Sequence, residues 1–296
     1  MPHPTRTYVR GQRFLHRFFQ VPRRGLDALD RRGTTQPPGR PYPAPMSEAE
    51  DLVRLASADN FRDVAGPGHR AGDGTPLRTG VFYRSNELRL TDEDAASIAS
   101  LGVSAIHDLR TRAEVEHRPG VDVPGATRHH VDVLGIPLEE ITELADAEAA
   151  VALMERVYRG FVEEPATRAA LGTLLTSLAV EGVHLFHCTA GKDRTGWTAA
   201  LLLHLAGVED TVVLADYLLT NTRAAASRAA TLRLIAETRG PDSAAVFEPV
   251  LLADADYLHT AYAAVEARYG TRERYLLDGL GLEPQVLDAL RARLRG

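Results

Sequence analysis

One stretch of ten residues, His187–Gly196, constrains the fold of this 296-residue chain more than any other. It begins at the end of Val183–His187, an almost continuously apolar run bounded by a glycine and a turn, which predicts a short, fully buried strand. A helical pattern then starts inside the stretch and continues over Thr195–Leu205. A buried strand that leads through a tight loop into a helix is typical of α/β proteins with parallel strands.

Strands and helices also alternate in the chain before this stretch, and the chain after it is almost entirely helical. Further strands are predicted over Val81–Arg84, Val103–Leu109 and Val131–Leu134. Helices are predicted over Thr91–Leu101 with Thr91 as N-cap, Ala147–Glu164, Ala166–Val180, Val212–Thr238, Val246–Tyr269 and Pro284–Leu294. The sequence therefore predicts an α/β fold, in which a central, mostly parallel sheet is flanked by helices and the C-terminal half is helical.

The residues of the stretch are suited to binding a tetrahedral oxyanion. Five residues separate Cys188 from Arg194, which lets the intervening backbone curl around one anion with its amide groups directed inward. The N-terminus of the following helix adds its N–H groups and its positive dipole end. Gly191 permits a backbone conformation that a β-carbon disfavours, and Arg194 can bind two phosphate oxygens at once. The predicted phosphate-binding residues are Thr189, Ala190, Gly191, Lys192, Asp193 and Arg194.

Cys188 is the candidate nucleophile of this loop. The positive surroundings favour its thiolate form, and a thiolate at the floor of an anion-binding loop suits attack on phosphorus. The only cysteine of the chain, its only lysine (Lys192) and its only tryptophan (Trp197) all fall within ten residues, although the chain has 34 basic residues. The alternative for a lone cysteine is a small buried hydrophobic side chain.

Two other loop chemistries fail on spacing. A Walker A loop needs glycine where this chain has Phe186, and serine or threonine where it has Asp193. His187 and Cys188 lack further ligands at a spacing that suits a metal ion. A single cysteine also excludes an internal disulfide framework and a multi-cysteine zinc site.

The stretch His187–Gly196 matches the signature of the cysteine-dependent phosphatases, Cys-x5-Arg-Ser/Thr. Its Ala-Gly-Lys-Asp-Arg-Thr-Gly part resembles the bacterial tyrosine and phosphoinositide phosphatases. Further segments resemble that family in the same order, namely Asn60–Asp63, Phe82–Ser85 with Glu87 and Leu88, Asp108–Arg110 and Ala215–Leu218. The resemblance covers residues 55–295 and leaves out the N-terminal part.

The resemblance implies a protein-tyrosine-phosphatase-like fold and hydrolysis of phosphotyrosine, extended to phosphoserine, phosphothreonine and phosphoinositides in a dual-specificity enzyme. It implies no metal and no other cofactor. It also implies that two helices within Val212–Tyr269 form a mobile lid over the pocket.

The expected reaction has two steps. The Cys188 thiolate attacks phosphorus in line and forms a cysteinyl-phosphate, which water then hydrolyses, while Arg194 and the loop amides neutralise the charge of the transition state. Thr195 is expected to donate its hydroxyl to the sulfur, and capping of the helix is a compatible second role. His187 is expected to brace the loop through backbone hydrogen bonds. Lys192 is expected to add charge at the pocket rim, which suits substrates with further phosphates.

Two carboxyl groups compete for the role of general acid, which protonates the leaving group. The usual device of the family, an aspartate on a separate loop, is absent, because the corresponding stretch Val131–Glu140 carries Leu138 where the acid is expected. Asp193 is the first candidate, because a dianionic phosphate beside it favours its protonated form, although neighbouring cations oppose this. The position resembles that of an aspartate in myotubularin-type lipid phosphatases. Asp108 is the second candidate, with an ion pair to Arg110 as its alternative role.

Charge divides the chain into two parts. Residues 1–45 contain nine arginines and two aspartates, a net charge of +7, so the remaining 251 residues carry −13 within the overall charge of −6. This balance argues against nucleic acid as a partner. Half of residues 36–45 are proline, which is typical of a stiff linker. We therefore expect a basic, proline-rich, disordered arm over residues 1–45 and a phosphatase domain over residues 46–296.

The arm has two interpretations. Its apolar residues between positions 14 and 19, set among arginines, would form a basic amphipathic helix that contacts an anionic membrane surface. The alternative is an extension without function, with Met46 as the true start. The sequence shows no apolar run of the ~20 residues that span a bilayer, and no signal-peptide pattern. A cytoplasmic location is expected, with export by a signal-less route as the alternative.

Three classes of function can be separated on the sequence. The leading one is an active phosphomonoesterase for phosphotyrosyl proteins, phosphoinositides or both, with a phosphoinositide phosphatase of little protein activity as a variant. A catalytically inactive phosphate-binding module would be expected to lack Cys188 or Arg194, and both are present. A sulfur-transfer or arsenate-reducing enzyme fits less well, because arsenate reduction relays oxidation through further cysteines. The sequence favours the phosphatase.

Overall fold

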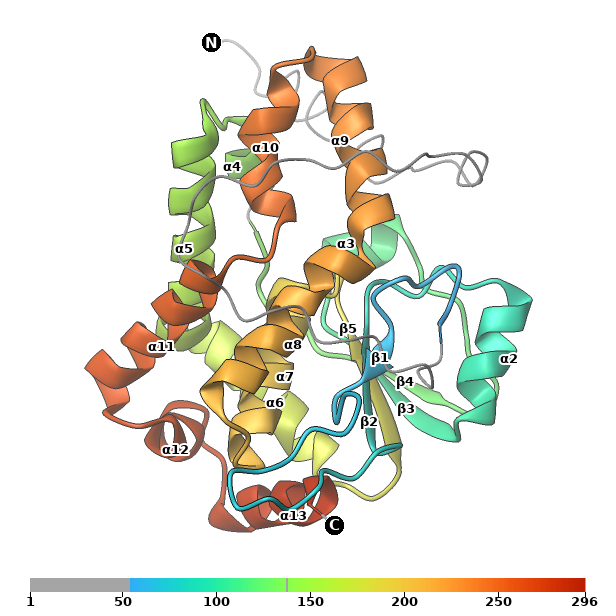
Figure 1. The fold of residues 1–296 in the computed structure, drawn as a ribbon, viewed down its shortest axis with the longest axis vertical. Coiled ribbons are helices and arrows are strands. Elements are labelled where there is room, and N and C mark those ends of the chain that lie inside the picture. The colour runs from blue at the N-terminus through green and yellow to red at the C-terminus, as the bar shows by residue number, and fades with distance from the viewer. Residues whose placement is uncertain (1–53, 137, 296) are drawn as a thin grey trace, which may run out of the picture.

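The computed structural model describes residues 54–136 and 138–295. Its centre is a five-stranded sheet with the order β1-β2-β5-β3-β4, in which only the β1–β2 pair is antiparallel (Figure 1). The strands are β1 (Arg62–Asp63), β2 (Phe82–Ser85), β3 (Val103–Asp108), β4 (Thr127–His130) and β5 (Val183–His187). The predicted α/β fold with a mostly parallel sheet is confirmed. The basic arm over residues 1–45 and Met46 lie outside the described residues.

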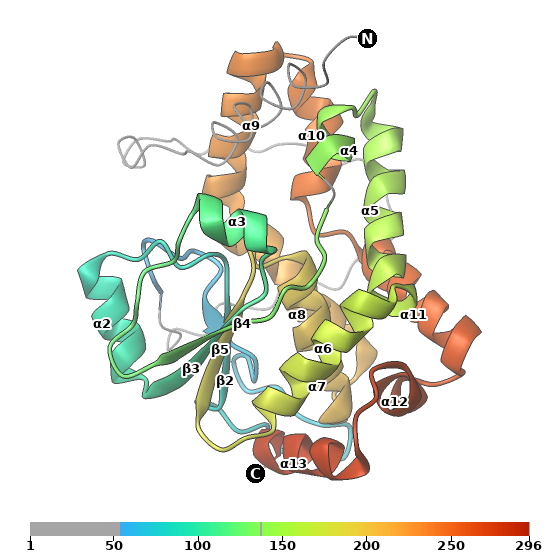
Figure 2. The same ribbon diagram turned by 180° about the vertical axis from the view of Figure 1, so that it is seen from behind.

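Helices cover both faces of this sheet. They are α2 (Asp92–Ser100), α3 (Arg112–His117), α4 (Leu138–Thr142), α5 (Ala147–Glu163), α6 (Pro165–Leu178), α7 (Asp193–Leu205), α8 (Asp210–Arg223), α9 (Ala225–Arg239), α10 (Ser243–Leu251), α11 (Ala255–Tyr269), α12 (Arg272–Arg274), the π-helical turn η1 (Tyr275–Gly279) and α13 (Pro284–Leu294). Figures 1 and 2 show α2 on one side of the sheet and α6, α7 and α8 on the other, with α9 and α10 side by side at one end of the molecule.

The central strand β5 explains why this segment is apolar throughout. It lies between β2 and β3, and neither Leu185 nor Phe186 is exposed. Because successive side chains of a strand point to opposite faces, Leu185 joins the core that includes α2, and Phe186 joins the larger core that includes α7. The sequence prediction for β5 is therefore confirmed at both ends.

One predicted strand is wrong. The sequence predicts a strand at Val131–Leu134, but β4 ends directly before it at His130. The prediction followed the apolar residues and missed the strand itself. The reason is that β4 is an edge strand whose Thr127, His129 and His130 are exposed, so it lacks the pattern of a buried strand. The buried side chains of Val131 and Val133 enter the core from irregular backbone that follows the strand.

Two predicted helices are each divided in two. The span Val212–Thr238 breaks at Ala224 between α8 and α9, and Val246–Tyr269 breaks between α10 and α11. At the second break, the amide side chain of Asn221 accepts from the Ala253 N–H at 2.8 Å and donates to the Ala253 carbonyl at 2.7 Å. This long-range contact replaces helical hydrogen bonds, so helical periodicity alone could not reveal it.

Within the part of the chain that the structure describes, none of the helices combines the length and the apolar character that crossing a membrane requires.

Candidate active site

The loop of the predicted stretch lies at the carboxyl end of the central strand. Cys188 follows β5 directly, and α7 begins at Asp193. Only 2% of the Cys188 surface is exposed. In open parallel sheets, ligands bind beyond the carboxyl ends of the strands. The fold therefore places the cysteine where a binding site is expected.

Outside partners hold the carbonyl groups of the loop. The Glu87 N–H donates to the Thr189 carbonyl at 3.0 Å, and the Asn60 side-chain amide donates to the Ala190 and Gly191 carbonyls at 3.2 and 3.0 Å. A trans peptide directs its N–H opposite to its carbonyl, so the amides of this segment are turned to the other side. In the described part of the chain, the N–H groups of residues 190–192 donate to no other backbone carbonyl. Among the described residues these amides are thus available to an anion, and phosphate binding by them stays a prediction.

Gly191 is required by the close approach of the loop to the neighbouring strand. Its φ of 67° lies in the left-handed region. A β-carbon here would lie 2.6 Å from the Ser85 carbonyl oxygen and 2.7 Å from the Asn86 nitrogen. Because both are backbone atoms at the end of β2, no side-chain rotation could relieve the overlap.

Arg194 is oriented by a carboxylate that the sequence analysis did not identify. Its Nη1 and Nη2 donate to the two Glu114 carboxylate oxygens at 2.7 and 2.9 Å, and Nη1 also donates to the Leu109 carbonyl at 3.2 Å. The Thr189 hydroxyl donates to the same carboxylate. A β-carbon on Gly135 would lie 3.0 Å from the guanidinium carbon, so the backbone after β4 passes close over this arginine.

The ion pair between Arg194 and Glu114 shifts the pKa of both groups. Burial alone would raise the pKa of Glu114, but the Arg194 charge and the hydrogen bonds to it hold that pKa well below its usual range. Burial alone would lower the pKa of Arg194, and Glu114 more than offsets this and raises it. A signal was present in the sequence: Thr111 and Glu114 form a capping box at the start of α3, so this glutamate is fixed in place.

Asp193 is held by two donors on one oxygen. Lys192 Nζ lies 2.6 Å from its Oδ1, and the Tyr158 hydroxyl donates to the same Oδ1 at 2.9 Å. The hydroxyls of Tyr158 and Tyr217 are 2.6 Å apart. Lys192 is 2% exposed and its ammonium group lies 5.6 Å from the centre of the Tyr257 ring, so the structure places it inside the site and not at the rim.

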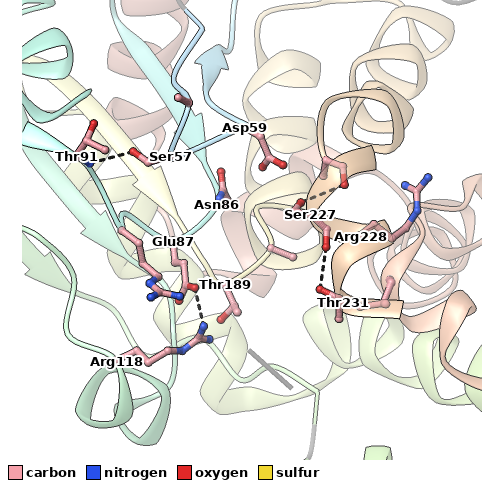
Figure 3. Close-up of a pocket in the computed structure, with 15 residues that line it drawn as sticks. Ser57, Asp59, Asn86, Glu87, Thr91, Arg118, Thr189, Ser227, Arg228 and Thr231 are labelled. Atoms are coloured by element: carbon pink, nitrogen blue, oxygen red, sulfur yellow. Dashed lines mark hydrogen bonds and ion pairs between the residues drawn. The ribbon is translucent and has the colours of Figure 1, made fainter. Parts of the chain in front are cut away.

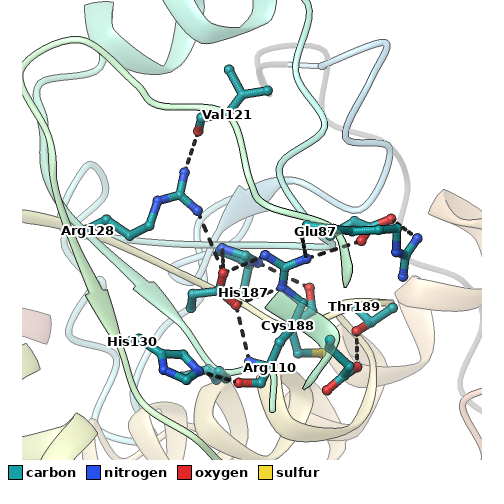
Figure 4. Close-up of polar contacts among 12 residues, drawn as sticks. Glu87, Arg110, Val121, Arg128, His130, His187, Cys188 and Thr189 are labelled. Atoms are coloured by element: carbon teal, nitrogen blue, oxygen red, sulfur yellow. Dashed lines mark hydrogen bonds and ion pairs between the residues drawn. The ribbon is translucent and has the colours of Figure 1, made fainter. Parts of the chain in front are cut away.

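Asp108 lies at the end of β3 and is buried, in a polar cluster of which Figure 4 shows Arg110 and His187. Arg110 Nε and Nη2 donate to its two oxygens at 2.8 and 2.6 Å. Burial raises the pKa of Asp108, but the hydrogen bonds and charge of Arg110, together with His187, outweigh burial and lower it. The alternative role considered for Asp108, an ion pair with Arg110, is the one that the structure shows.

His187 adjoins the same cluster. Burial lowers its pKa to about 4, so the ring is neutral at neutral pH. Its Nδ1 lies 3.2 Å from the Cys188 carbonyl, and its Nε2 lies 3.7 Å from Asp108 Oδ2. The contact with the Cys188 carbonyl is of the kind that bracing of the loop requires, and the role itself stays a prediction.

Thr195 lies in the first turn of α7 and is fully buried. Within the described residues, its hydroxyl has no hydrogen-bond partner. The N-cap of α7 is Lys192, and no side chain caps that end of the helix. The Thr195 hydroxyl is therefore not used for capping.

A pocket of about 410 Å³ opens beside the loop (Figure 3). Thr189 and Ala190 line it, and Figure 3 shows Glu87 and Arg118 on one side of Thr189 and Ser227 and Arg228 on the other. Arg118 Nη1 is 2.6 Å from a Glu87 oxygen. Ser227 and Arg228 of α9 also line the pocket, so a helix within the predicted lid region does border the site.

Comparisons of the sequence with known proteins find tyrosine phosphatases. A model of the tyrosine phosphatase family matches residues 53–296. The chain is 30% identical to the triple specificity protein phosphatase PtpB of Mycobacterium tuberculosis over 283 residues, 82% of this chain and 98% of that protein. It is 31% identical to a putative tyrosine-protein phosphatase of Cupriavidus necator over 259 residues, 83% of this chain and 90% of that protein. The chain therefore belongs to the tyrosine phosphatase family, whose members are hydrolases that act on phosphomonoesters.

Proposed function

We propose that the protein hydrolyses phosphotyrosyl proteins, and phosphoinositides as a second substrate class, through a cysteinyl-phosphate intermediate. The observation that carries the proposal is the loop itself: Cys188 lies at its start, its carbonyls are bound from outside, and Arg194 lies at its end. The triple specificity named for the relative from Mycobacterium tuberculosis supports the wider substrate range.

In the first step, the Cys188 sulfur forms a bond to phosphorus while the bond between phosphorus and the leaving oxygen breaks. Asp193 gives its proton to that oxygen, and Arg194 with the loop amides binds the equatorial oxygens. In the second step, Asp193 accepts a proton from water, the water oxygen bonds to phosphorus, and the bond between phosphorus and sulfur breaks. Inorganic phosphate leaves and the thiolate is restored. The buried Thr195 hydroxyl donates to the sulfur in both steps.

We assign the general acid to Asp193 and not to Asp108. Both donors that reach Asp193 bind its Oδ1, which leaves Oδ2 for the proton that moves. Asp108 instead accepts two hydrogen bonds from Arg110 and is fully buried. Lys192 then acts on the acid, not on a distant phosphate of the substrate. His187 keeps its bracing role.

Three further assignments stay predictions. They are the domain boundary at residue 46, the contact of the basic arm with an anionic membrane surface, and the cytoplasmic location. Removal of residues 1–45 tests the first two together, because the shortened chain should keep its turnover of a soluble substrate and lose its binding to anionic vesicles.

The test of the function is hydrolysis of p-nitrophenyl phosphate by the wild type, Cys188→Ser and Asp193→Asn without added metal. Cys188→Ser should abolish turnover, and vanadate should inhibit the wild type. Full turnover by Cys188→Ser would contradict the mechanism, and no turnover by the wild type would indicate a phosphate-binding module. Phosphotyrosyl peptides compared with phosphoinositides then rank the two substrate classes.

A further inference from the structure

We propose that Arg84 is a positioning residue of this reaction, whose buried guanidinium fixes the Gly191–Lys192 peptide of the loop and supplies the positive charge that keeps Cys188 ionised. The inference rests on the proposed cysteinyl-phosphate mechanism and adds to it a residue outside the loop. Arg84 lies on β2, adjacent to β5, and is not exposed.

Arg84 contacts the loop directly. Its Nη2 donates to the Gly191 carbonyl at 3.0 Å, and its Nη1 lies 2.6 Å from Asp216 Oδ2 on α8. The Asn60 side chain donates to the same Gly191 carbonyl. One charged and one neutral donor thus converge on a single loop oxygen from outside the anion site.

The position of this oxygen determines the direction of the next amide. The peptide between Gly191 and Lys192 is trans, so the Lys192 N–H points opposite to the Gly191 carbonyl. Rotation of the peptide would break both hydrogen bonds to the carbonyl, and a hydrogen bond from a charged donor is about twice as strong as a neutral one. Arg84 therefore holds this amide in the direction that an oxyanion requires before any substrate arrives.

The charged side chains of the loop and of the residues packed against it do not sum to zero. Four cations and three carboxylates are involved, namely Arg62, Arg84, Lys192 and Arg194 against Glu114, Asp193 and Asp216. The loop cations each have a carboxylate of their own, whereas Arg62 and Arg84 share Asp216, at 3.0 and 2.6 Å. One positive charge is left over among these seven side chains, and burial makes such a charge costly.

A Cys188 thiolate supplies the missing negative charge. Arg84 interacts electrostatically with Cys188, as does Arg194 at the end of the loop. Burial and the charge of Arg62 lower the pKa of Arg84 to about 10, so it stays cationic at neutral pH. The other titratable group beside Asp216 is His69, whose pKa is lowered by burial, so it adds no charge there.

Three variants separate the two roles of Arg84. Arg84→Met removes both the charge and the hydrogen bond, Arg84→Lys keeps the charge without the planar fork, and Asn60→Ala removes the other donor to Gly191 without changing the charge. The matched control is Arg293→Met. Arg293 is also a buried arginine, and it donates to the carbonyl of Gly182, which precedes β5.

The readouts are alkylation of Cys188 by iodoacetamide as a function of pH, inhibition by vanadate, and thermal unfolding. For Arg84→Met, the midpoint of alkylation should move up by about one pH unit or more, and vanadate inhibition should weaken about tenfold or more. Arg84→Lys should keep the wild-type midpoint and bind vanadate weakly. Asn60→Ala should do the same, and Arg293→Met should match the wild type in both assays.

A folded Arg84→Met with wild-type alkylation and wild-type vanadate inhibition would overturn the proposal. If Arg84→Met unfolds at a much lower temperature than Arg293→Met, the other two variants decide, and unchanged vanadate inhibition in both would overturn it. Cys188→Ser distinguishes this from failure of the mechanism. Turnover without the thiol contradicts the proposed function, whereas an inactive Cys188→Ser beside an unaffected Arg84→Met contradicts only the role of Arg84.

Discussion

Glu114 binds Arg194 through both carboxylate oxygens, at 2.7 and 2.9 Å, and so determines the direction in which the guanidinium faces the loop. The two residues come from helices on different parts of the chain, α3 and α7. With Nη1 also donating to the Leu109 carbonyl, Nε and the second Nη2 hydrogen remain for the oxygens of a substrate. In the proposed mechanism, Glu114 is thus a positioning residue for Arg194.

Substitution of Glu114 should therefore reduce catalysis by misdirecting Arg194. Glu114→Gln keeps one acceptor oxygen and should lower kcat/KM for p-nitrophenyl phosphate about 10- to 100-fold, because small displacements of a binding group have effects of this size. Glu114→Ala should in addition lower the free energy of unfolding by about 3–5 kcal/mol, since it leaves a buried charge unpaired. Steady-state kinetics and urea denaturation check both. Wild-type kcat/KM in Glu114→Gln would show that Arg194 needs no such partner.

Tyr158→Phe should weaken the proposed general acid, Asp193, without removing it. The variant loses the donor at 2.9 Å from Asp193 Oδ1, so the carboxyl group becomes less well oriented. We expect kcat to fall about tenfold for an alkyl phosphate, whose leaving group needs the proton, and much less for p-nitrophenyl phosphate. The matched control is Tyr262→Phe, which removes a hydroxyl that is hydrogen-bonded to His204 Nε2 at 2.7 Å. Equal losses on both substrates would contradict a role of Tyr158 in proton transfer.

Gly191→Ala should abolish activity, both because alanine disfavours a positive φ and because its β-carbon collides with β2. Gly281→Ala separates these two effects. The two glycines have nearly the same φ, 67° and 68°, but a β-carbon on Gly281 meets nothing within 4 Å. Gly281→Ala should thus cost only the backbone strain, about 1–2 kcal/mol of unfolding free energy. Gly191→Ala also collides with the end of β2, so vanadate binding should be lost. Retained vanadate inhibition in Gly191→Ala would show that the loop tolerates a shift away from β2.

Stability should fall as the pH is lowered from 6.5 to about 4 because of two buried histidines. His107 Nε2 lies 2.9 Å from His184 Nδ1, and burial lowers the pKa of the two rings to about 3 and about 4, from an ordinary value of 6.5. The unfolded chain binds protons at these rings below pH 6.5 and the folded chain does not, so their contribution is complete above pH 6.5 and is lost as the pH falls. By pH 4 the loss should be on the order of 3 kcal/mol for each ring, because each pH unit corresponds to about 1.4 kcal/mol.

Urea denaturation at about pH 7.5 and about pH 5 measures this dependence. His107→Phe keeps a ring that can stack on His184 and should show a smaller difference between the two pH values. His259→Gln, at an exposed site on α11, should keep the wild-type difference. An unchanged difference in His107→Phe would assign the acid sensitivity to other groups.

The loop and its two flanking elements could be predicted because they depend on consecutive residues. An apolar run specifies β5, and the spacing from Cys188 to Arg194 predicts a loop that can surround an anion. The same local reasoning failed at Val131–Leu134 and at the breaks after Arg223 and Leu251. At these places a sheet edge or a contact such as Asn221 with Ala253 overrides the pattern.

The partners of the loop depend instead on the order of strands in the sheet. Because β5 lies between β2 and β3, Arg84 reaches Gly191 from the β2 side, while Asp108 and Glu114 lie at or after the end of β3. These residues are separated from the loop by about 80 to 110 positions in the chain, and no local periodicity relates them. The sequence alone thus determined the strand, the loop and the helix, and it is the source of the proposed nucleophile Cys188 and of the proposed phosphate-binding loop. Only the tertiary structure decided which charges surround them, because electrostatic interactions act through space and not along the chain.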